Sequence, residues 1–354
     1  MWDSIIDAIT KANDWVNGIV WGWPMIVMIL GTGILLTVRT RALQVRKFGT
    51  SMSATIVPAI RDMKKKDGAH RGKNTVSQFE AFAAAISGTV GTGNIVGVTS
   101  AILTGGPGAV LWMWVSAFFG MVTNYSENVL GLYYRKKEKD GTFSGGAFYY
   151  IAYGLKQRWL GYIAAIFCLL AAIGMSGVQA NKITGSFLSV LDTEATWVKL
   201  LIGGVVALLT CVVILGGIKR IGRIASLLVP FMSLLFIAMA LVIIGINIKA
   251  VPETFRLIFG SAFSAKAVAG GVGGFAFSQI IKKGLARGVF SNEAGLGSSV
   301  IAHSASETRE PVKQGLWGIF EVFFDTFVIC TLTALVILTS NIGSGAYADG
   351  SFFG

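Results

Sequence analysis

The chain has 354 residues, of which 53% are hydrophobic and 14% are charged, and its mean hydropathy is +0.67. Water-soluble domains have about 25% charged residues, so this composition excludes an ordinary soluble protein. The net charge of +12 would suit a nucleic-acid-binding protein, but the basic residues lie between apolar runs. We therefore expect a polytopic all-α membrane protein whose partner is the lipid bilayer and not nucleic acid.

Eight apolar runs have a length suited to membrane spans, since a helix needs about 20 mainly apolar residues to cross a bilayer. The predicted spans are 19–38, 79–103, 109–134, 160–191, 198–217, 224–246, 268–281 and 316–338. The connections 39–73, 135–158, 219–223 and 282–313 hold 10, 6, 3 and 5 of the 30 basic residues. Basic connections stay in the cytoplasm, so we expect a multi-pass protein of the cell membrane with its N-terminus outside.

The second predicted span contains Gly-Thr-Val-Gly-Thr-Gly-Asn at 88–94. Each interior glycine disfavours a helix by roughly 1 kcal/mol relative to alanine. The pattern predicts a break at mid-membrane depth, where free backbone groups meet a ligand or line a cavity. Close helix packing through small residues is the alternative, but two threonines and Asn94 add polar groups that packing alone does not require.

A second glycine-rich stretch, Gly-Gly-Val-Gly-Gly-Phe-Ala-Phe-Ser-Gln at 270–279, interrupts the seventh predicted span. Paired glycine interruptions in two halves of a chain indicate a transporter site. Phe275 and Phe277 could wall an apolar pocket, and Ser278 and Gln279 could bind the ligand's amine or carboxylate. Taken singly, each phenylalanine is almost as well explained as a packed or lipid-facing side chain.

Ionisable residues inside spans are functional candidates because a bilayer disfavours charge. Glu127 and Glu321 lie near predicted span ends, where gating or solvation at the interface explains them equally well. Asp325 and Lys182 lie deeper and could form a structural pair or take part in ion coupling. We found no constellation of catalytic residues, which argues against an enzyme.

The connection at 284–311 is unusually polar and rich in glycine. It could form an inner gate, with Asn292 and Glu293 at a turn, or be a plain solvated loop. His70 and His303 fall in predicted cytoplasmic connections without a catalytic companion, so both are expected to be solvated.

The run GGPGAVLWMWVSAFFG at 105–120 closely resembles the signature of the alanine or glycine:cation symporter family, also called the sodium:alanine symporter family. The runs GLARGVFSNEAGLGSS at 284–299 and GTVGTGN at 88–94 are similar to that family too. The resemblance covers nearly the whole chain. It implies secondary active symport of alanine or glycine with Na⁺, or in some members H⁺, by alternating access and without a cofactor; glutamine and serine remain alternatives as substrate.

The resemblance further implies a LeuT-type inverted-repeat fold in one domain over 1–354. In that fold 19–38 is an extra helix, 79–246 is the first five-helix repeat, and 268–338 begins the second. By the same resemblance the substrate is bound by two unwound segments, and Na⁺ by the first of them. The implied substrate residues are Gly91, Thr92, Gly93, Gly271, Gly274, Phe275, Phe277, Ser278 and Gln279, and the implied Na⁺ ligands are Val90, Asn94 and Thr89.

The number of predicted spans departs from the family pattern. The fold requires ten core helices, and only seven predicted spans follow the extra helix, so about three are missing at the C-terminus together with hydroxyl ligands for a sodium site. We therefore also expect, as the alternative, a fragment or a truncated paralogue that does not transport.

Overall fold

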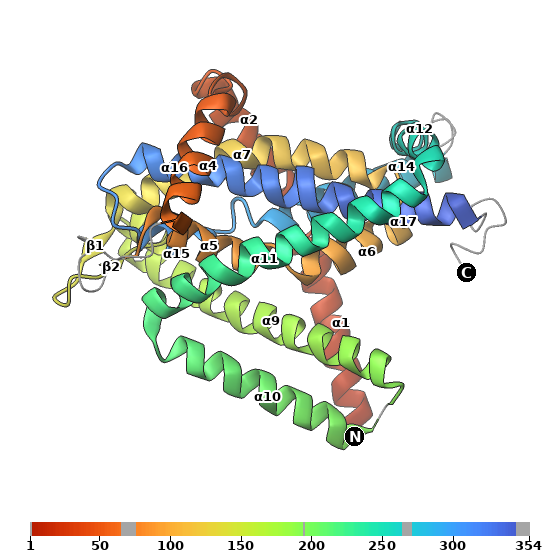
Figure 1. Ribbon diagram of the computed structural model, residues 1–354, viewed down its shortest axis with the longest axis horizontal. Coiled ribbons are helices and arrows are strands. Elements are labelled where there is room, and N and C mark those ends of the chain that lie inside the picture. The colour runs from red at the N-terminus through yellow and green to blue at the C-terminus, as the bar shows by residue number, and fades with distance from the viewer. Residues whose placement is uncertain (1, 65–75, 194, 264–270, 345–354) are drawn as a thin grey trace.

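The computed structural model describes residues 2–64, 76–193, 195–263 and 271–344. These residues form helices and one short β-hairpin (Figure 1). The N-terminal part comprises α1 (Trp2–Val20), α2 (Trp23–Arg39), α3 (Leu43–Arg46), α4 (Phe48–Lys64), α5 (Gln78–Thr89), the π-helical η1 (Gly93–Gly97) and α6 (Val98–Gly105). The middle part comprises α7 (Ala109–Tyr134), β1 (Lys136–Lys137), β2 (Phe143–Ser144), α8 (Ala147–Tyr149), η2 (Tyr150–Gly154), α9 (Arg158–Leu191), α10 (Thr196–Ile214) and α11 (Gly217–Ile246). The last part comprises η3 (Ile248–Ala250), α12 (Val251–Ala262), α14 (Gly271–Asn292), α15 (Ser299–Ser304), α16 (Pro311–Val322), the π-helical η4 (Phe323–Cys330) and α17 (Thr331–Ser344).

Among the described residues, five helical segments are long and apolar enough to cross a membrane, or six if a pair bent by 46° is counted as one span. The five are Ile6–Arg39, Arg158–Leu191, Thr196–Ile214, Gly217–Ile246 and Pro311–Asn341, and the bent pair is Gln78–Thr89 with Gly93–Gly105. The chain is therefore an all-α membrane-embedded protein. The LeuT-type arrangement, the number of spans and the orientation remain predictions.

Helix α7 lies at the centre of the fold, with α14 and α16 packed along it. Glycines allow the close approach. In α14, a side chain at Gly284 would overlap the backbone of α7 and one at Gly288 would overlap the Ser116 side chain of α7. In α16, a side chain at Gly318 would overlap Asn124 and Asn128. The small residues of three helices thus bring polar side chains of α7 into direct contact with those of α16.

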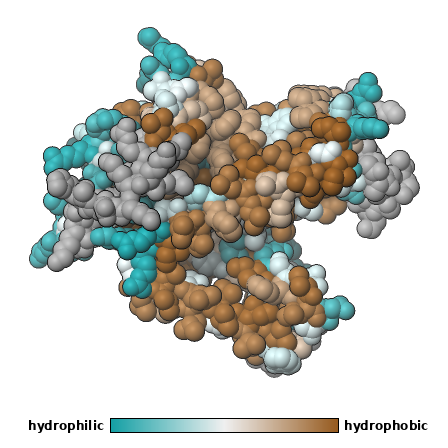
Figure 2. All heavy atoms as spheres, in the orientation of Figure 1, coloured by the Kyte–Doolittle hydropathy of each residue, from teal (hydrophilic) through white to brown (hydrophobic). Residues whose placement is uncertain are grey.

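Helices α9, α10 and α11 present large apolar side chains on the outside of the molecule. Phe167, Leu208 and Leu234 are each about two-thirds exposed. Figure 2 shows this brown surface along the long helices, with teal polar residues gathered towards the end that carries the β-hairpin and α4. In lipid such a surface is solvated by acyl chains.

The seventh predicted span differs most from the structure. Residues 271–279 are helical and belong to α14, which continues to Asn292. The predicted interruption at Gly271–Gln279 is therefore wrong, and the helix ends thirteen residues later, inside the connection that was expected to be cytoplasmic. The remaining residue of that stretch, Gly270, and the predicted span's first residues lie outside the described residues.

Candidate functional site

The predicted break in the second span is present. Helix α5 begins with a capping box, in which the Glu80 N–H donates to the Ser77 hydroxyl and the Ser77 N–H donates to the Glu80 carboxylate. The helix ends at Thr89, Val90 has extended backbone angles, and the chain resumes as η1 at Gly93. The break leaves carbonyls at the end of α5 and N–H groups at the start of η1 without helical partners.

Asn94 is the buried centre of the first break. Its Oδ1 accepts the Gly91 N–H at 2.8 Å, and its Nδ2 donates to Asp325 Oδ1 at 2.6 Å. This orientation of the amide is fixed chemically, because a backbone N–H can only donate and a carboxylate accepts. The Asn94 side chain thus joins the two π-helical segments η1 and η4, and its shortest bond across them is the one to Asp325.

Asp325 collects further donors from neighbouring elements. The hydroxyls of Ser291, at the end of α14, and of Thr326 each donate to Asp325 Oδ2 at 2.9 Å. The sulfur of Cys330 lies 3.2 Å from the Ser291 hydroxyl. Three elements that are far apart in sequence therefore converge on one carboxylate.

The Asp325 site carries a buried negative charge without a matching cation. Asp325 is fully buried, and within the described residues no Lys, Arg or His forms an ion pair with it. Lys182, the residue considered as its partner, is exposed on α9. An uncompensated charge is strongly disfavoured in the interior, and the C-terminus of α5 adds further negative potential, so the ionised carboxylate requires a proton or a cation.

Two side chains enclose the break from opposite helices. The Thr92 hydroxyl donates to Gln179 Oε1 of α9 at 2.7 Å, and a β-carbon at Gly91 would lie 3.2 Å from Gln179 Nε2. A β-carbon at Gly93 would lie 4.0 Å from the ring of Phe290 on α14. Gly91, Thr92 and Gly93 are therefore partly buried, with the Gln179 amide beside the first two and the Phe290 ring nearest to the third.

A hollow of about 380 Å³ opens beside Phe290 and is lined by residues of α1 and α14. Arg287 lies on its wall, donates to the Ser100 hydroxyl at 3.2 Å and lies over the Phe290 ring. The hollow therefore lies beside Phe290, the ring nearest to Gly93, and its wall carries the positive charge of Arg287.

The predicted residues of α14 lie away from the first break. Ser278 accepts a hydrogen bond from the Trp23 indole at 3.3 Å and lies thirteen residues, or about 20 Å along a helix, from Ser291. Phe277 and Gln279 are half-buried in the same part of α14. The backbone of Gly271, Gly274 and Phe275 is helical, while their side chains lie outside the described residues.

A second break follows α14. Glu293, Gly295 and Gly297 have positive φ angles of 53°, 91° and 76°. The Asn292 side chain accepts the Ala294 N–H at 3.1 Å, and the Glu127 carboxylate accepts the Gly295 N–H at 2.9 Å. Asn292 and Glu293 do lie at a turn, as predicted, but Asn292 is buried and the segment is a structured part of the interior instead of a plain solvated loop.

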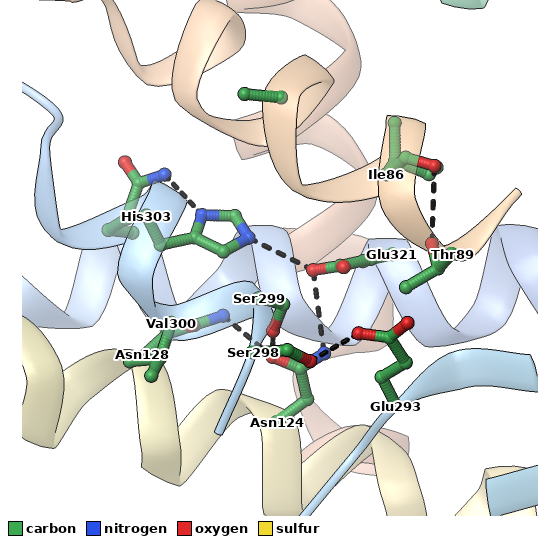
Figure 3. A network of polar contacts seen from close by, with 12 residues as sticks. Ile86, Thr89, Asn124, Asn128, Glu293, Ser298, Ser299, Val300, His303 and Glu321 are labelled. Atoms are coloured by element: carbon green, nitrogen blue, oxygen red, sulfur yellow. Dashed lines mark hydrogen bonds and ion pairs between the residues drawn. The ribbon is translucent and has the colours of Figure 1, made fainter. Parts of the chain in front are cut away.

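A polar network lies beside the second break (Figure 3). His303 of α15 and Glu321 of α16 are fully buried, and the ring Nε2 lies 2.9 Å from the carboxylate Oε2. Asn124 of α7 donates to the same oxygen at 3.4 Å. The expectation that His303 is a solvated loop histidine is wrong, because α15 folds back against α5 and α7; His70 lies outside the described residues.

Sequence reasoning missed Gln179, Phe290 and Ser291 as site residues. Gln179 is a polar residue inside the apolar run 160–191, which is a usable signal. Phe290 and Ser291 precede Asn-Glu-Ala-Gly-Leu-Gly, where two polar or charged residues meet two glycines. That composition was a stronger signal for a break than the glycines at 270–274, which lack polar neighbours.

Comparison with known proteins places these features in a family. The model of the sodium:alanine symporter family matches residues 6–352. The sodium/alanine symporter AgcS of Methanococcus maripaludis is 41% identical over 342 residues, which cover 95% of this chain and 72% of AgcS.

Two further relatives have similar coverage. An uncharacterised transporter of Haemophilus influenzae is 41% identical over 328 residues, covering 92% of this chain and 69% of the relative. The probable sodium/glutamine symporter GlnT of Bacillus subtilis is 38% identical over 326 residues, covering 92% and 64%. The chain therefore belongs to the sodium:alanine symporter family, a family of amino-acid transporters.

Proposed function

We propose that the protein is a secondary active symporter of the cell membrane that imports a small neutral amino acid, alanine or glycine, together with Na⁺. The observation that carries the proposal is the meeting of a broken helix with the buried, uncompensated Asp325 carboxylate through Asn94. A helix that serves only packing requires neither a break nor a buried carboxylate. Ion coupling, in contrast, requires a site where a cation neutralises a negative charge.

The Na⁺ site in this proposal lies between the end of α5 and Asp325. Asp325 and the Ser291 hydroxyl supply hard oxygen ligands, and the carbonyls of Thr89 and Val90 end the inner half-helix. The oxygen of Asn94 already accepts the Gly91 N–H, so it would reach the ion through its second lone pair. Na⁺ would balance the buried carboxylate and tie α5, α14 and η4 together.

The substrate in this proposal lies against the start of η1. The Gly91 N–H donates a hydrogen bond to Asn94. The N–H groups of Thr92 and Gly93 would therefore bind the substrate carboxylate at a helix N-terminus. Gln179 and Phe290 would limit the side chain to a small one, because both already lie close to the glycines of the break. Arg287 would attract the carboxylate during entry.

Alternating access follows from the way the ion joins separate elements. With Na⁺ absent, the unpaired Asp325 carboxylate lacks solvation, and this favours an arrangement that admits water to Asp325. With Na⁺ and substrate bound, the broken span, α14 and η4 hold together in an occluded state. The ligands shift the equilibrium by their different affinities for the two arrangements.

Uptake of radiolabelled alanine into proteoliposomes that contain the 354-residue chain tests the proposal. We expect accumulation with an inward Na⁺ gradient and none with an inward K⁺ gradient. Competition with unlabelled glycine, serine and glutamine then ranks the substrates. Uptake that is equal in both gradients would reject Na⁺ coupling, and no specific uptake of any of the four amino acids would reject the proposed function of this chain.

A further inference from the structure

We propose that His303 and Glu321 form a proton-binding site that is separate from the Na⁺ site and that neutralises the polar network beside the second break when a proton binds. Its link to transport rests on the proposed function, whereas proton binding itself does not. The two side chains come from different elements, α15 and α16, and both are fully buried.

The network is arranged so that the carboxylate is incompletely satisfied. Glu321 Oε2 lies 2.9 Å from His303 Nε2 and receives Asn124 Nδ2 at 3.4 Å, while Oε1 is buried without a hydrogen-bond partner in the part of the chain that the structure describes. An unsatisfied oxygen on a buried anion is strongly disfavoured. One added proton would remove that charge.

Gln314 allows the imidazole ring to take the proton. Its amide Nε2 lies 2.7 Å from His303 Nδ1, and its Oε1 is buried without a partner among the described residues. With the amide nitrogen facing the ring, Nδ1 accepts and the ring is neutral, carrying its proton on Nε2. A half-turn of the amide presents Oε1 instead, which accepts an N–H from a doubly protonated ring. The pair then changes from a net charge of −1 to a neutral imidazolium–carboxylate pair.

The charges around the pair favour uptake of a proton. Glu127 of α7, Glu293 of the connection and Asp325 of η4 all interact unfavourably with Glu321. Glu80 lies on α5, and the described side chains of α4 include no titratable group. The cation that contacts this region is Arg135, which donates to the carbonyls of Ser304, Ser306 and Thr308. Burial lowers the pKa of Arg135 to about 10, so it stays charged at neutral pH.

The position of His303 connects the proton site to the broken span. The Glu307 N–H, just after α15, donates to the Val76 carbonyl, just before α5, at 2.9 Å. Helix α15 also packs against α5. The His303–Glu321 contact therefore fastens the unit formed by α15 and the inner half of the broken span to α16. A change from a charged–neutral contact to an ion pair strengthens that attachment.

Nitrogen NMR of the histidine ring tests the site directly. The chain has two histidines, so His70→Gln leaves His303 as the single labelled ring in the full chain in lipid nanodiscs. We expect a neutral ring protonated on Nε2 at the alkaline end of the titration and a doubly protonated ring at its acidic end. In the same background Glu321→Gln should lower the proton affinity of the ring at least about tenfold, because the buried negative charge is removed. Glu253→Gln, which removes an exposed carboxylate on α12, should leave the affinity unchanged.

A ring that stays neutral throughout, or that titrates identically in the Glu321→Gln variant, would overturn the proposal. If Glu321→Gln does not yield monodisperse protein, Gln314→Met takes its place: it removes the acceptor for the Nδ1 proton and should lower the affinity about three- to tenfold, and an unchanged affinity would again overturn the proposal. None of these measurements requires uptake, so absence of alanine transport would reject the proposed function and leave the proton site to be decided by the NMR.

Discussion

The two breaks in this molecule are built in different ways. Between Thr89 and Gly93 no residue has a positive φ angle, and the break is held by side chains from elsewhere: Gln179 of α9, and Asn94 bonded to Asp325. After Asn292 the break has Glu293, Gly295 and Gly297 all in the left-handed region, and the distant Glu127 accepts the Gly295 N–H. The first break therefore depends on side-chain contacts that include Asp325, whereas the second depends on left-handed backbone as well as on a side-chain contact.

Removal of the charge at the first break should have the largest effect. Asp325→Asn keeps the shape of the side chain but leaves no charge for Na⁺ to balance, so we expect the affinity for Na⁺ to fall by more than about 100-fold. The measurement is the Na⁺ concentration that gives half-maximal alanine uptake in proteoliposomes. Glu253→Gln serves as the control, and native Na⁺ dependence in Asp325→Asn would place the ion elsewhere.

Asn94→Ala removes the side chain that joins the two π-helical segments. The partly buried Gly91 N–H loses its acceptor and the buried Asp325 loses a donor, and the loss of about 1–3 kcal/mol corresponds to roughly 5- to 150-fold weaker Na⁺-dependent uptake. The same uptake assay measures it. Unchanged Na⁺ dependence would remove Asn94 from the ion site.

A pair of glycine substitutions tests whether the second break alone depends on left-handed backbone. Gly295→Ala places a β-carbon at φ 91° with only ordinary contacts nearby, so the strain of about 1–2 kcal/mol should lower the thermal unfolding temperature. Gly97→Ala, in η1 near the first break, has open space around the new β-carbon and a φ angle near −64°.

Thermal unfolding in detergent, followed by tryptophan fluorescence, compares the two glycine variants. We expect Gly97→Ala to unfold at or slightly above the native temperature. Equal destabilisation of both variants would show that the two breaks depend on glycine in the same way.

The smallest effect is expected at the bond between the first break and α9. Thr92→Val keeps the shape of the residue and removes the hydrogen bond to Gln179, which is worth about 1 kcal/mol. We expect a three- to tenfold increase in the alanine concentration for half-maximal uptake, with the Na⁺ dependence unchanged. A shift in Na⁺ affinity of the same size would mean that Gln179 acts on the ion site as well.

The class of protein and the first break could be predicted from the order of the residues. Apolar length alone located the helices at 158–191 and 196–214 to within three residues and the one at 217–246 with a start seven residues too late, because lipid forces every backbone group into a helix. The first break could be located because glycines that disfavour a helix stand beside the polar residues Thr89, Thr92 and Asn94. Inside a bilayer such polar groups have no water to bind, so they indicate a ligand site or a cavity. Asp325 stood out because charge is rare in a span.

Which polar groups meet could not be predicted, because it depends on the packing of distant helices. Nothing local to residues 271–279 shows that they stay helical. The composition after Phe290 signals a break, but it does not show which groups stabilise the turn after Asn292, and these include Glu127, which is more than 160 residues away in sequence. His303 has the sequence context of a loop residue until α15 folds back onto α5 and α7. Contacts such as Asn94 with Asp325 and His303 with Glu321 depend on how closely α7, α14 and α16 approach one another, and that distance is set by packing across the whole bundle.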